Sequence, residues 1–460
     1  MEPIRVLEIV TATNGRLLQG DPETVVGGIA IDSRKAERGQ LFFAFPGSAS
    51  DGHLHVDDAL NRGAAAAVIS RPVFIDGGQP LIMVVDPLRA LQDLARYYRQ
   101  LFTLPVVAVT GSTGKTTTKD LIAGVLGIGR RVLKTEGNQN NEIGLPLTML
   151  RLDRGYGAVV LEMAMRGPGE IAALCRLSQP RIGVITNIGM THLERLGSQQ
   201  AIAEAKGELL DALPPEGCAV LNGEDDWQRQ LALKCRCEVI FYGPGPEWPV
   251  NASDIVMNGL RGSEFMLHTP LGEAHCRLTL AGRHNVSNAL AAAAVGTRFG
   301  IHPEQIAQGL EAAFRTGMRL EIKKGIAGAT IIDDTYNASP DSVKAGLRLL
   351  ADVPDRGRTI AVLGDMYELG AETVTGHRSV GECAAAMQVD YLCTVGSLAR
   401  EIAIGARAAG LSDVKIGIFS DNQAAIAFMR ELIQSGDVIL VKGSRGARME
   451  QIVASLIEGG

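Results

Sequence analysis

Residues 105–126 constrain the fold of this chain more than any other stretch, and they read PVVAVTGSTGKTTTKDLIAGVL. A short apolar run at 106–109 is followed by a glycine-containing loop, and residues 116–126 have the periodicity of a helix. A buried strand, a loop and a helix in this order form the context of a phosphate-binding loop, because a helix N-terminus and its backbone N–H groups favour an anion. We therefore predict a nucleotide-binding domain built on a parallel sheet.

The loop departs at one position from the common pattern G-x-x-x-x-G-K-[ST], which requires glycine where this chain has Val109. We expect Lys115 to neutralise the β and γ phosphates, and the Thr116 hydroxyl to bind Mg²⁺. The loop by itself leaves open whether the nucleotide serves a switch, a motor, a kinase or a bond-making reaction. The residues predicted to bind ATP here are Gly111, Ser112, Thr113, Gly114, Lys115 and Thr116.

The chain has 460 residues, which is too many for one ordinary core, since single cores stop growing at about 250–300 residues. Apolar strand candidates alternate with helical patterns, and this alternation predicts parallel sheets covered on both faces. We predict an α/β protein with three domains. They are a small N-terminal α/β domain at 1–85, a central P-loop parallel-sheet ATPase domain at 86–317, and a C-terminal Rossmann-like open sheet at 318–460.

Composition argues for an ordinary soluble protein. The formal net charge is −6 and no long run of lysine and arginine occurs, so we expect no nucleic-acid partner. No run approaches the roughly 18 apolar residues of a membrane span, and the first residues lack the pattern of a signal peptide. The seven cysteines form no C-x-x-C pair, and we interpret them as small buried residues in a reducing compartment. We therefore expect a cytoplasmic protein.

Two metal-ligand candidates follow apolar strand patterns of the predicted central domain. Glu162 ends the run AVVLE, and His192 follows ITNIGMT. A carboxylate directly after a buried strand, in a nucleotide-binding domain, suits Mg²⁺. The alternative is that either residue is a surface or core group without a role in binding.

Lys206 lies in the middle of the apolar face of a predicted helix, with Ile202, Leu209 and Leu210 around it. One interpretation is a lysine that extends along this face and keeps its ammonium in water. The other is a desolvated lysine with a lowered pKa. Its neutral amine can react with CO₂ to give a carbamate, which is an anionic metal ligand.

A polar loop follows the predicted phosphate-loop helix and reads TEGNQNNEIGLP at 135–146. It carries Asn138, Asn140 and Asn141, whose uncharged side chains can donate and accept hydrogen bonds. Asparagines in loops are often turn-formers. Their position shortly after the helix favours a ligand contact as the second interpretation.

A second polar stretch, DDTYNASPDS at 333–342, lies where the first strand of the last domain meets a helix. Ligands of open parallel sheets bind at the carboxyl ends of the strands, so this is an expected binding position. The alternative is that Ser339 or Asp341 only caps the helix.

Six stretches, taken together and in order, resemble the Mur ligases, the ATP-dependent enzymes that add amino acids to the bacterial cell-wall precursor. The phosphate loop of that family characteristically lacks the first glycine of the common motif, as this chain does at Val109. The resemblance covers nearly the whole chain. The stretches are VTGSTGKTTTK, GNQNNEIGLP, EMAMRGPGEI, NIGMTHLE, AEAKGEL and AGRHNVSNALAA.

Within the family, the last domain is most similar to the member that adds a dipeptide. DDTYNASP, GDMYELG and VKGSRGARME fit that member, although Ser339 stands where it typically has asparagine. The diaminopimelate-adding member usually carries D-N-P-R in its last domain, and no such string occurs here. The resemblance implies ATP-dependent joining of D-alanyl-D-alanine to UDP-N-acetylmuramoyl-tripeptide through an acyl phosphate, in peptidoglycan precursor synthesis. We expect the enzyme to be a monomer.

The resemblance also implies roles for individual residues. The catalytic residues would be Lys115, Glu162, His192 and Lys206, with Lys206 carbamylated. The ligands of Mg²⁺ would be Thr116, Glu162, His192 and Lys206. Beyond the phosphate loop, ATP would contact Asn138, His284, Asn285, Asn288, Arg319, Asp334 and Tyr336. The UDP-sugar and peptide substrates would contact Asp32, Ser33, Arg34, Asn140, Asn141, Asn337 and Lys442.

Two alternative functions stay open at this point. Another Mur-type ligase or a folylpolyglutamate synthase would use a different acceptor, although in the latter the phosphate loop comes near the start and about 100 residues precede it here. A P-loop ATPase switch would hydrolyse ATP with neither peptide substrate. The sequence does not distinguish lysine from diaminopimelate as the third residue of the tripeptide.

Overall fold

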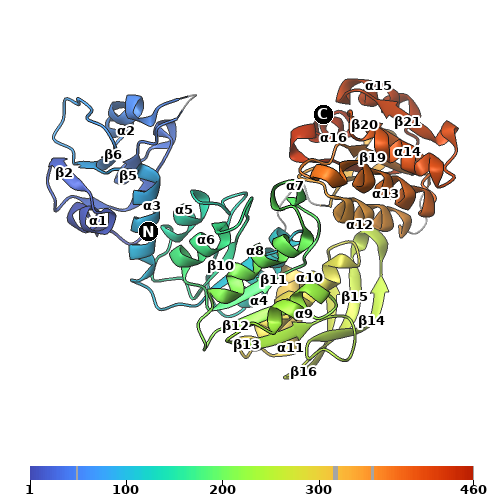
Figure 1. Cartoon of the computed structure of the whole chain (residues 1–460), viewed down its shortest axis with the longest axis horizontal. Coiled ribbons are helices and arrows are strands. Elements are labelled where there is room, and N and C mark those ends of the chain that lie inside the picture. Colours follow the sequence, from blue (N-terminus) through green and yellow to red (C-terminus); the bar gives the residue numbers. More distant parts are fainter. Residues whose placement is uncertain (48–49, 314–319, 354–356, 459–460) are drawn as a thin grey trace.

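The computed structural model describes residues 1–47, 50–313, 320–353 and 357–458 of the chain. Figure 1 shows three bodies, with the N-terminal and C-terminal sheets as two arms on either side of a central sheet. Each body is a sheet with helices packed on it. The predicted α/β class with three sheet-based domains is therefore confirmed.

The N-terminal body is a small, mostly parallel sheet. Its elements are β1 (Ile4–Arg5), α1 (Val6–Thr13), β2 (Arg16–Gln19), β3 (Val25–Val26), β4 (Gly28–Ala30), β5 (Gln40–Phe43), α2 (Val56–Asn61), β6 (Ala66–Ile69) and β7 (Leu81–Met83). The strand order is β2-β7-β6-β5-β4, with β2 antiparallel to β7 and the other neighbours parallel. A separate short ladder joins β1 to β3.

Helix α3 (Pro87–Arg99) connects this body to the central one. The Asp86 side chain accepts hydrogen bonds from the N–H groups of Leu88 and Arg89, and proline occupies the first turn, so the helix start is specified locally. Its buried face packs on α1 and on two helices of the central body. One continuous apolar core therefore runs from the first body into the central one.

The central body is built on a parallel sheet of six strands in the order β13-β12-β11-β8-β10-β9. Val109 pairs with Glu162 and Thr110 pairs with Ile185, so β8, β10 and β11 end at the same edge of the sheet. The elements of the sheet and its covering helices are β8 (Val106–Thr110), α4 (Lys115–Gly127), β9 (Val132–Lys134), α5 (Gly144–Met149), β10 (Ala158–Glu162), α6 (Glu170–Ser178), β11 (Ile182–Ile185), α7 (Leu193–Leu196), α8 (Gln199–Asp211), β12 (Cys218–Asn222), α9 (Asp226–Ala232) and β13 (Glu238–Tyr242).

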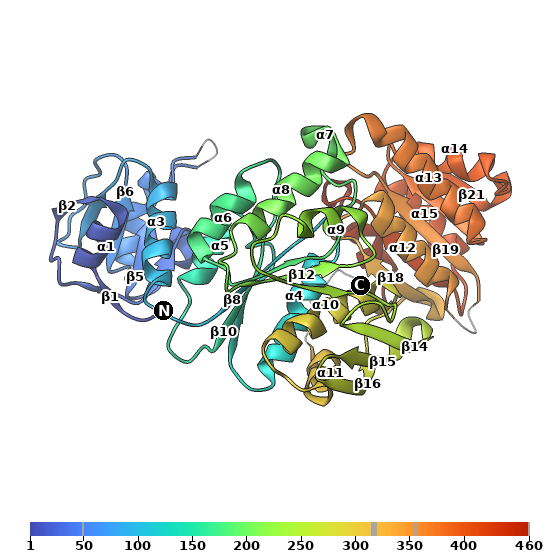
Figure 2. The same ribbon diagram turned by 60° about the horizontal axis from the view of Figure 1, so that its bottom comes forward.

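Apolar cores cover both faces of this sheet, which explains why β8 is buried along its whole length. Figure 2 shows α6 and α8 on one side of the sheet and α4 on the other. An antiparallel sheet and two further helices complete the body, and this sheet has no counterpart in the sequence prediction. These elements are β14 (Asn251–Met257), β15 (Ser263–Thr269), β16 (Gly272–Leu278), α10 (His284–Arg298) and α11 (Pro303–Ala312).

The C-terminal body is an open sheet in the order β17-β18-β22-β19-β20-β21, parallel except for β17 at one edge. Helices α12, α13 and α14 cover one face, and α15 and α16 cover the other. Its elements are β17 (Glu321–Lys324), β18 (Thr330–Asp334), α12 (Pro340–Ala351), β19 (Thr359–Gly364), α13 (Thr373–Ala386), β20 (Tyr391–Val395), α14 (Arg400–Ala408), β21 (Ile416–Phe419), α15 (Asn422–Leu432), β22 (Val438–Lys442) and α16 (Glu450–Leu456).

Two expectations from composition concern the whole chain. All seven cysteines are free thiols, and burial raises the pKa of Cys175 to about 12. Four of them are buried and three are half-buried, so the interpretation as buried residues holds for most of them. In the described part of the chain, no helix is long and apolar enough to cross a membrane.

Candidate nucleotide and metal site

The phosphate loop connects the end of β8 to the start of α4, at the edge where the parallel strands end. Gly111 has a φ of 148° and Gly114 a φ of 78°, and both values favour glycine. A Cβ on Gly111 would lie 1.9 Å from Thr186 Oγ1, and one on Gly114 would lie 2.6 Å from Asn288 Oδ1. Both glycines are therefore needed for the shape of the loop. The Lys115 ammonium donates to the Gly111 carbonyl at 2.7 Å.

Residues that follow β11 hold the loop in place. The Asn187 side chain accepts from the Thr113 N–H at 2.8 Å and donates to the Thr113 hydroxyl at 2.5 Å. The Gly189 N–H donates to the Ser112 hydroxyl at 2.8 Å. The sequence prediction missed Asn187 as a site residue, although it lies in the quoted stretch NIGMTHLE.

Glu162 ends β10 directly beside the phosphate-loop helix. Its buried carboxylate accepts hydrogen bonds from the Thr116 hydroxyl and from the Asn140 amide, each at 2.8 Å. Hydroxyl and carboxylate oxygens are the ligand atoms that Mg²⁺ prefers, so Thr116 and Glu162 fit that cation. Within the described ranges, no group of three or more His, Cys, Asp or Glu residues could hold a metal ion. A divalent cation here would therefore depend on mixed ligands, with Glu162 as the carboxylate.

Lys206 projects from α8 into the interior and is 2% exposed. Its amine has no hydrogen bond or ion pair with any residue that the structure describes. Burial, and next the charge of Lys115, lower the pKa of Lys206 well below its ordinary value. The prediction of a desolvated lysine is confirmed, and the alternative of a lysine with its ammonium in water is wrong.

His192 lies at the start of α7 with a left-handed φ of 64°. Burial lowers the pKa of its ring, the Glu368 carboxylate opposes that shift, and the charges of Lys206 and Lys115 add to it. These effects place His192 near both lysines of the site. Its Nδ1 lies 2.6 Å from Glu368 Oε2, and Glu368 belongs to the C-terminal body. The sequence prediction quoted GDMYELG but did not single out Glu368.

The three asparagines of the 135–146 loop have different surroundings. The Asn140 amide donates a hydrogen bond to the Glu162 carboxylate, as described above. Asn141 accepts hydrogen bonds from the N–H groups of Ile143 and Gly144, so it forms the turn before α5. Asn138 is exposed. The turn-forming interpretation therefore holds for Asn141, and the loop brings Asn140 to the candidate metal ligands.

The start of α10 packs against the phosphate-loop helix. Asn288 accepts from the Thr118 hydroxyl at 3.2 Å and donates to Asn285 at 2.9 Å. His284 is exposed at the helix start, and the charges of Asp334 and Lys442 from the C-terminal body act on its ring. The predicted residues His284, Asn285 and Asn288 thus lie between the phosphate loop and the C-terminal body.

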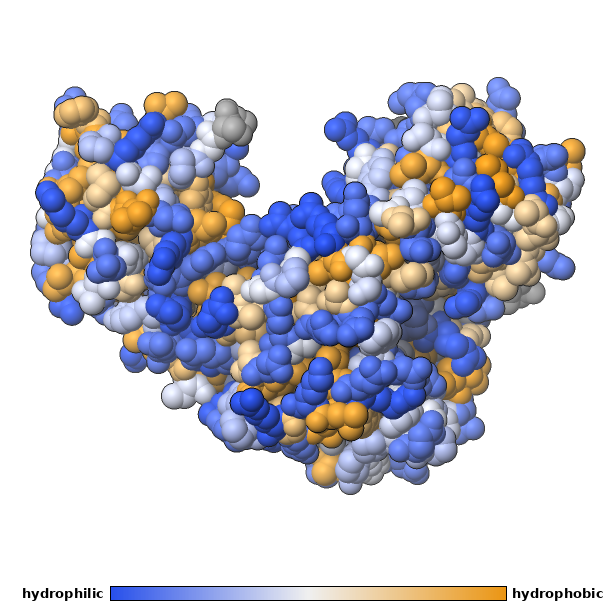
Figure 3. All heavy atoms as spheres, in the orientation of Figure 1, coloured by the Kyte–Doolittle hydropathy of each residue, from blue (hydrophilic) through white to orange (hydrophobic). Residues whose placement is uncertain are grey.

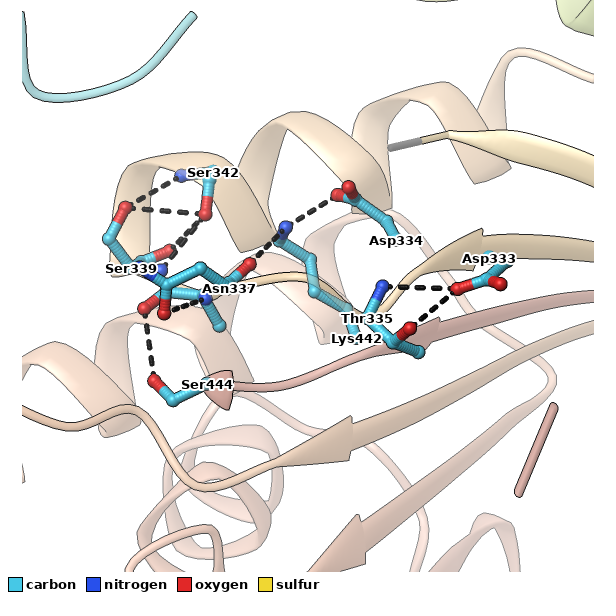
Figure 4. Close-up of polar contacts among 9 residues, drawn as sticks. Asp333, Asp334, Thr335, Asn337, Ser339, Ser342, Lys442 and Ser444 are labelled. Carbon is cyan, nitrogen blue, oxygen red and sulfur yellow. Dashed lines mark hydrogen bonds and ion pairs between the residues drawn. The ribbon is translucent and has the colours of Figure 1, made fainter. Parts of the chain in front are cut away.

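The C-terminal body contributes a buried lysine, shown in Figure 4. Lys442 ends β22 beside Asp334 at the end of β18, because the two residues pair in the parallel ladder. Its side chain is 3% exposed, and its ammonium donates to the Asp334 carboxylate and, at 2.9 Å, to the Asn337 carbonyl. Tyr336 is half-buried in the same turn. The structure therefore gathers four of the five residues predicted from this domain, and the fifth, Arg319, lies outside the described residues.

The helix-capping alternative for the 333–342 stretch is correct for Ser339. Its hydroxyl accepts from the Ser342 N–H, and the Ser342 hydroxyl accepts from the Ser339 N–H (Figure 4). The Asp341 carboxylate lies close to Gly189 of the central body, since a Cβ placed on Gly189 would be 2.8 Å from Asp341 Oδ2. The Asp341 carboxylate thus reaches the central body beside the phosphate loop.

The predicted UDP-sugar residues lie in the N-terminal body. Asp32 accepts hydrogen bonds from the backbone and from the guanidinium of Arg34, chiefly the latter, which lowers the pKa of Asp32 to about 2. Ser33 is buried next to them, whereas the Arg34 side chain is mostly exposed. Arg319, predicted to contact ATP, lies outside the described residues.

Three family models match the chain: "Mur ligase family, catalytic domain" at 25–99, "Mur ligase middle domain" at 109–296 and "Mur ligase, glutamate ligase domain" at 318–445. The UDP-N-acetylmuramoyl-tripeptide–D-alanyl-D-alanine ligase of Bacillus subtilis (strain 168) is 41% identical over 95% of this chain and 94% of its own length. A crystal structure of MurF from Acinetobacter baumannii matches with a TM-score of 0.90 and 33% identity, covering 99% of this chain and 98% of that one. The structure of MurF ligase from Thermotoga maritima in complex with ADP matches with a TM-score of 0.81 and 29% identity, covering 93% and 96%. With three matching domain models and full-length relatives of this similarity, the chain belongs to the Mur ligase family.

Proposed function

We propose that this chain is the ATP-dependent ligase that joins D-alanyl-D-alanine to UDP-N-acetylmuramoyl-tripeptide. The observation that carries the proposal is similarity over nearly the full length to a ligase of that name. The phosphate loop, with its candidate metal ligands, supports the ATP-dependent part of the reaction. We propose further that the enzyme is a cytoplasmic monomer with domain limits near residues 85 and 317.

The proposed reaction uses ATP to activate a carboxylate, because amide formation in water is uphill. The γ-phosphoryl group is transferred to the terminal carboxylate of the tripeptide, which gives an acyl phosphate and ADP. The amine of D-alanyl-D-alanine attacks the acyl carbon, the new C–N bond forms, phosphate leaves, and the amine loses a proton. Such transfer depends mainly on positioning and charge neutralisation, which Lys115 and the loop N–H groups can supply.

Mg²⁺ would be held by Thr116, Glu162 and His192, where it would neutralise charge on the phosphates. We propose that Lys206 adds an anionic ligand after its neutral amine attacks CO₂, forming an N–C bond and releasing a proton. The support is the burial of Lys206 without a partner among the described residues. A Lys206→Ala variant that regains activity with added short carboxylates would support the carbamate, whereas full activity without them would exclude it.

The remaining contacts are those that the family resemblance implies. We propose that His284, Asn285, Asn288, Asp334 and Tyr336, with Asn138 and Arg319, contact ATP between the central and C-terminal bodies. The face of the central body between the two arms is hydrophilic (Figure 3), which suits a UDP-sugar peptide. We propose that this substrate and the dipeptide contact Asp32, Ser33, Arg34, Asn140, Asn141, Asn337 and Lys442.

The test is incubation of the protein with ATP, Mg²⁺, the tripeptide precursor and D-alanyl-D-alanine. We expect phosphate release and a pentapeptide precursor, and release should require both peptide substrates. Phosphate release with a different acceptor would indicate another Mur step or folate polyglutamylation. ATP hydrolysis with neither substrate would indicate a P-loop switch, and either of these results would overturn the proposal.

A further inference from the structure

Three polar side chains of α4 point toward the strands that carry the metal site. Thr116, Lys119 and Asp120 are spaced three and four residues apart, which places them on one face of the helix. Thr116 donates to Glu162, as described above. Lys119 is only 1% exposed, and a charged group this deeply buried is costly unless hydrogen bonds satisfy it.

The partners of Lys119 lie at the start of the polar loop. Its ammonium donates to the Thr135 carbonyl at 2.9 Å and lies 3.2 Å from the Asp120 carboxylate. Thr135 is fully buried between β9 and the loop that reaches Asn140. A charge-assisted hydrogen bond to a buried carbonyl is strong, and leaving that carbonyl unpaired would be costly.

Thr135 in turn contacts the backbone of the candidate metal ligand. Its hydroxyl accepts a hydrogen bond from the Glu162 N–H at 3.0 Å, and its own N–H donates to the Val160 carbonyl at 3.1 Å. The other end of the loop is also tied to this strand, since Asn140 donates to the Glu162 carboxylate. Lys119 is therefore connected to Glu162 through a single intervening residue.

We propose that Lys119 is a positioning residue of the metal site, which holds Thr135 and thereby fixes the Glu162 carboxylate for the divalent cation. This inference rests on the proposed function, because it takes Glu162 as a ligand of Mg²⁺. Partners that orient metal ligands typically contribute about 10- to 100-fold in metal affinity. Without the ammonium, Thr135 loses its hydrogen bond to the phosphate-loop helix, and the contacts of Thr116 with Glu162 and of Lys134 with Asp120 remain.

The competing interpretation is that Lys119 serves only as a counter-ion of Asp120. The chain offers a matched control, because the Lys134 ammonium also pairs with Asp120, at 2.6 Å. Lys119→Met and Lys134→Met each remove one cation from the same carboxylate. Only Lys119→Met also removes the hydrogen bond to the Thr135 carbonyl.

The experiment measures Mn²⁺ binding by electron paramagnetic resonance, with a non-hydrolysable ATP analogue present, on the folded full-length protein. Mn²⁺ accepts the same oxygen ligands as Mg²⁺. We expect Lys119→Met to weaken Mn²⁺ binding by about 10-fold or more, and Lys134→Met to change it by less than about twofold. Thr135→Val removes the hydroxyl that accepts from Glu162 and should also weaken binding, whereas Thr135→Ser should keep it.

Equal Mn²⁺ affinity in wild type, Lys119→Met and Thr135→Val would overturn the inference, and so would equal losses in the two lysine variants. If Lys119→Met does not fold, the contrast between Thr135→Val and Thr135→Ser decides the matter. Failure of the proposed function looks different. In that case the wild-type protein itself would show no acceptor-dependent phosphate release, whatever the variants do to Mn²⁺ binding.

Discussion

Replacing Lys206 by methionine should stabilise the central body while removing ligase activity. The Lys206 side chain is 2% exposed, and no residue in the described part of the chain bonds to its amine. A buried donor without a partner costs about 1–3 kcal/mol, and methionine fills a similar volume without a polar group. We therefore expect Lys206→Met to raise the free energy of unfolding by about 1–3 kcal/mol at pH 10.

The gain in free energy of unfolding of Lys206→Met over wild type should grow as the pH falls. Its sign follows from the lowered pKa of Lys206. Between the folded-state pKa and the ordinary lysine value, the unfolded chain binds a proton that the folded chain does not. Wild-type stability then rises with pH by up to about 1.4 kcal/mol per unit. Lys206→Met lacks this dependence, so its advantage over wild type is larger at pH 8 than at pH 10.

The assay is urea unfolding followed by tryptophan fluorescence, in CO₂-free and metal-free buffer so that the lysine stays an amine. The two tryptophans, Trp227 and Trp248, both belong to the central body, and Trp227 lies in α9, which packs on α8. Lys119→Met is the matched control, because that buried lysine has partners, and we expect it to destabilise the protein by about 2 kcal/mol. A less stable Lys206→Met variant, or a stability difference that does not change between pH 8 and 10, would refute the reasoning.

Three further predictions concern single contacts. Gly111→Ala should abolish binding of ATP in calorimetry, because its Cβ would collide with the Thr186 hydroxyl and the φ disfavours alanine; unchanged affinity would contradict the assigned loop shape. Glu368→Gln should weaken the contact between the central and C-terminal bodies by removing the charge that faces His192. Small-angle scattering should then show a larger radius of gyration, and an unchanged profile would show that other contacts hold the arrangement. Ser339→Ala should lower the unfolding free energy of the C-terminal body by about 1 kcal/mol, since α12 loses its N-cap, and calorimetry that finds no shift would contradict this.

Much of the site could be predicted from local sequence, since a strand, a glycine turn and a helix start are set by neighbouring residues. The phosphate loop is of this kind, because Gly111 and Gly114 adopt backbone conformations that favour glycine. Ser339 is another, and its capping role follows from the residue type before a helix. The antiparallel sheet from β14 to β16 was missed, because its strands alternate buried and more exposed residues and lack the continuous apolar run of β8 or β10.

The partners of polar side chains could not be predicted in the same way. Lys119 and Lys206 are both buried lysines on helices of the central body, and only the structure shows that one has partners. Glu368 was overlooked because its contact with His192 joins two bodies of the chain. The sequence by itself determined the α/β class, the phosphate loop and the family resemblance, all of which depend on residues close together along the chain. The tertiary structure alone decided which charges meet and which stay without a partner, because the strand order brings together residues that are far apart in sequence.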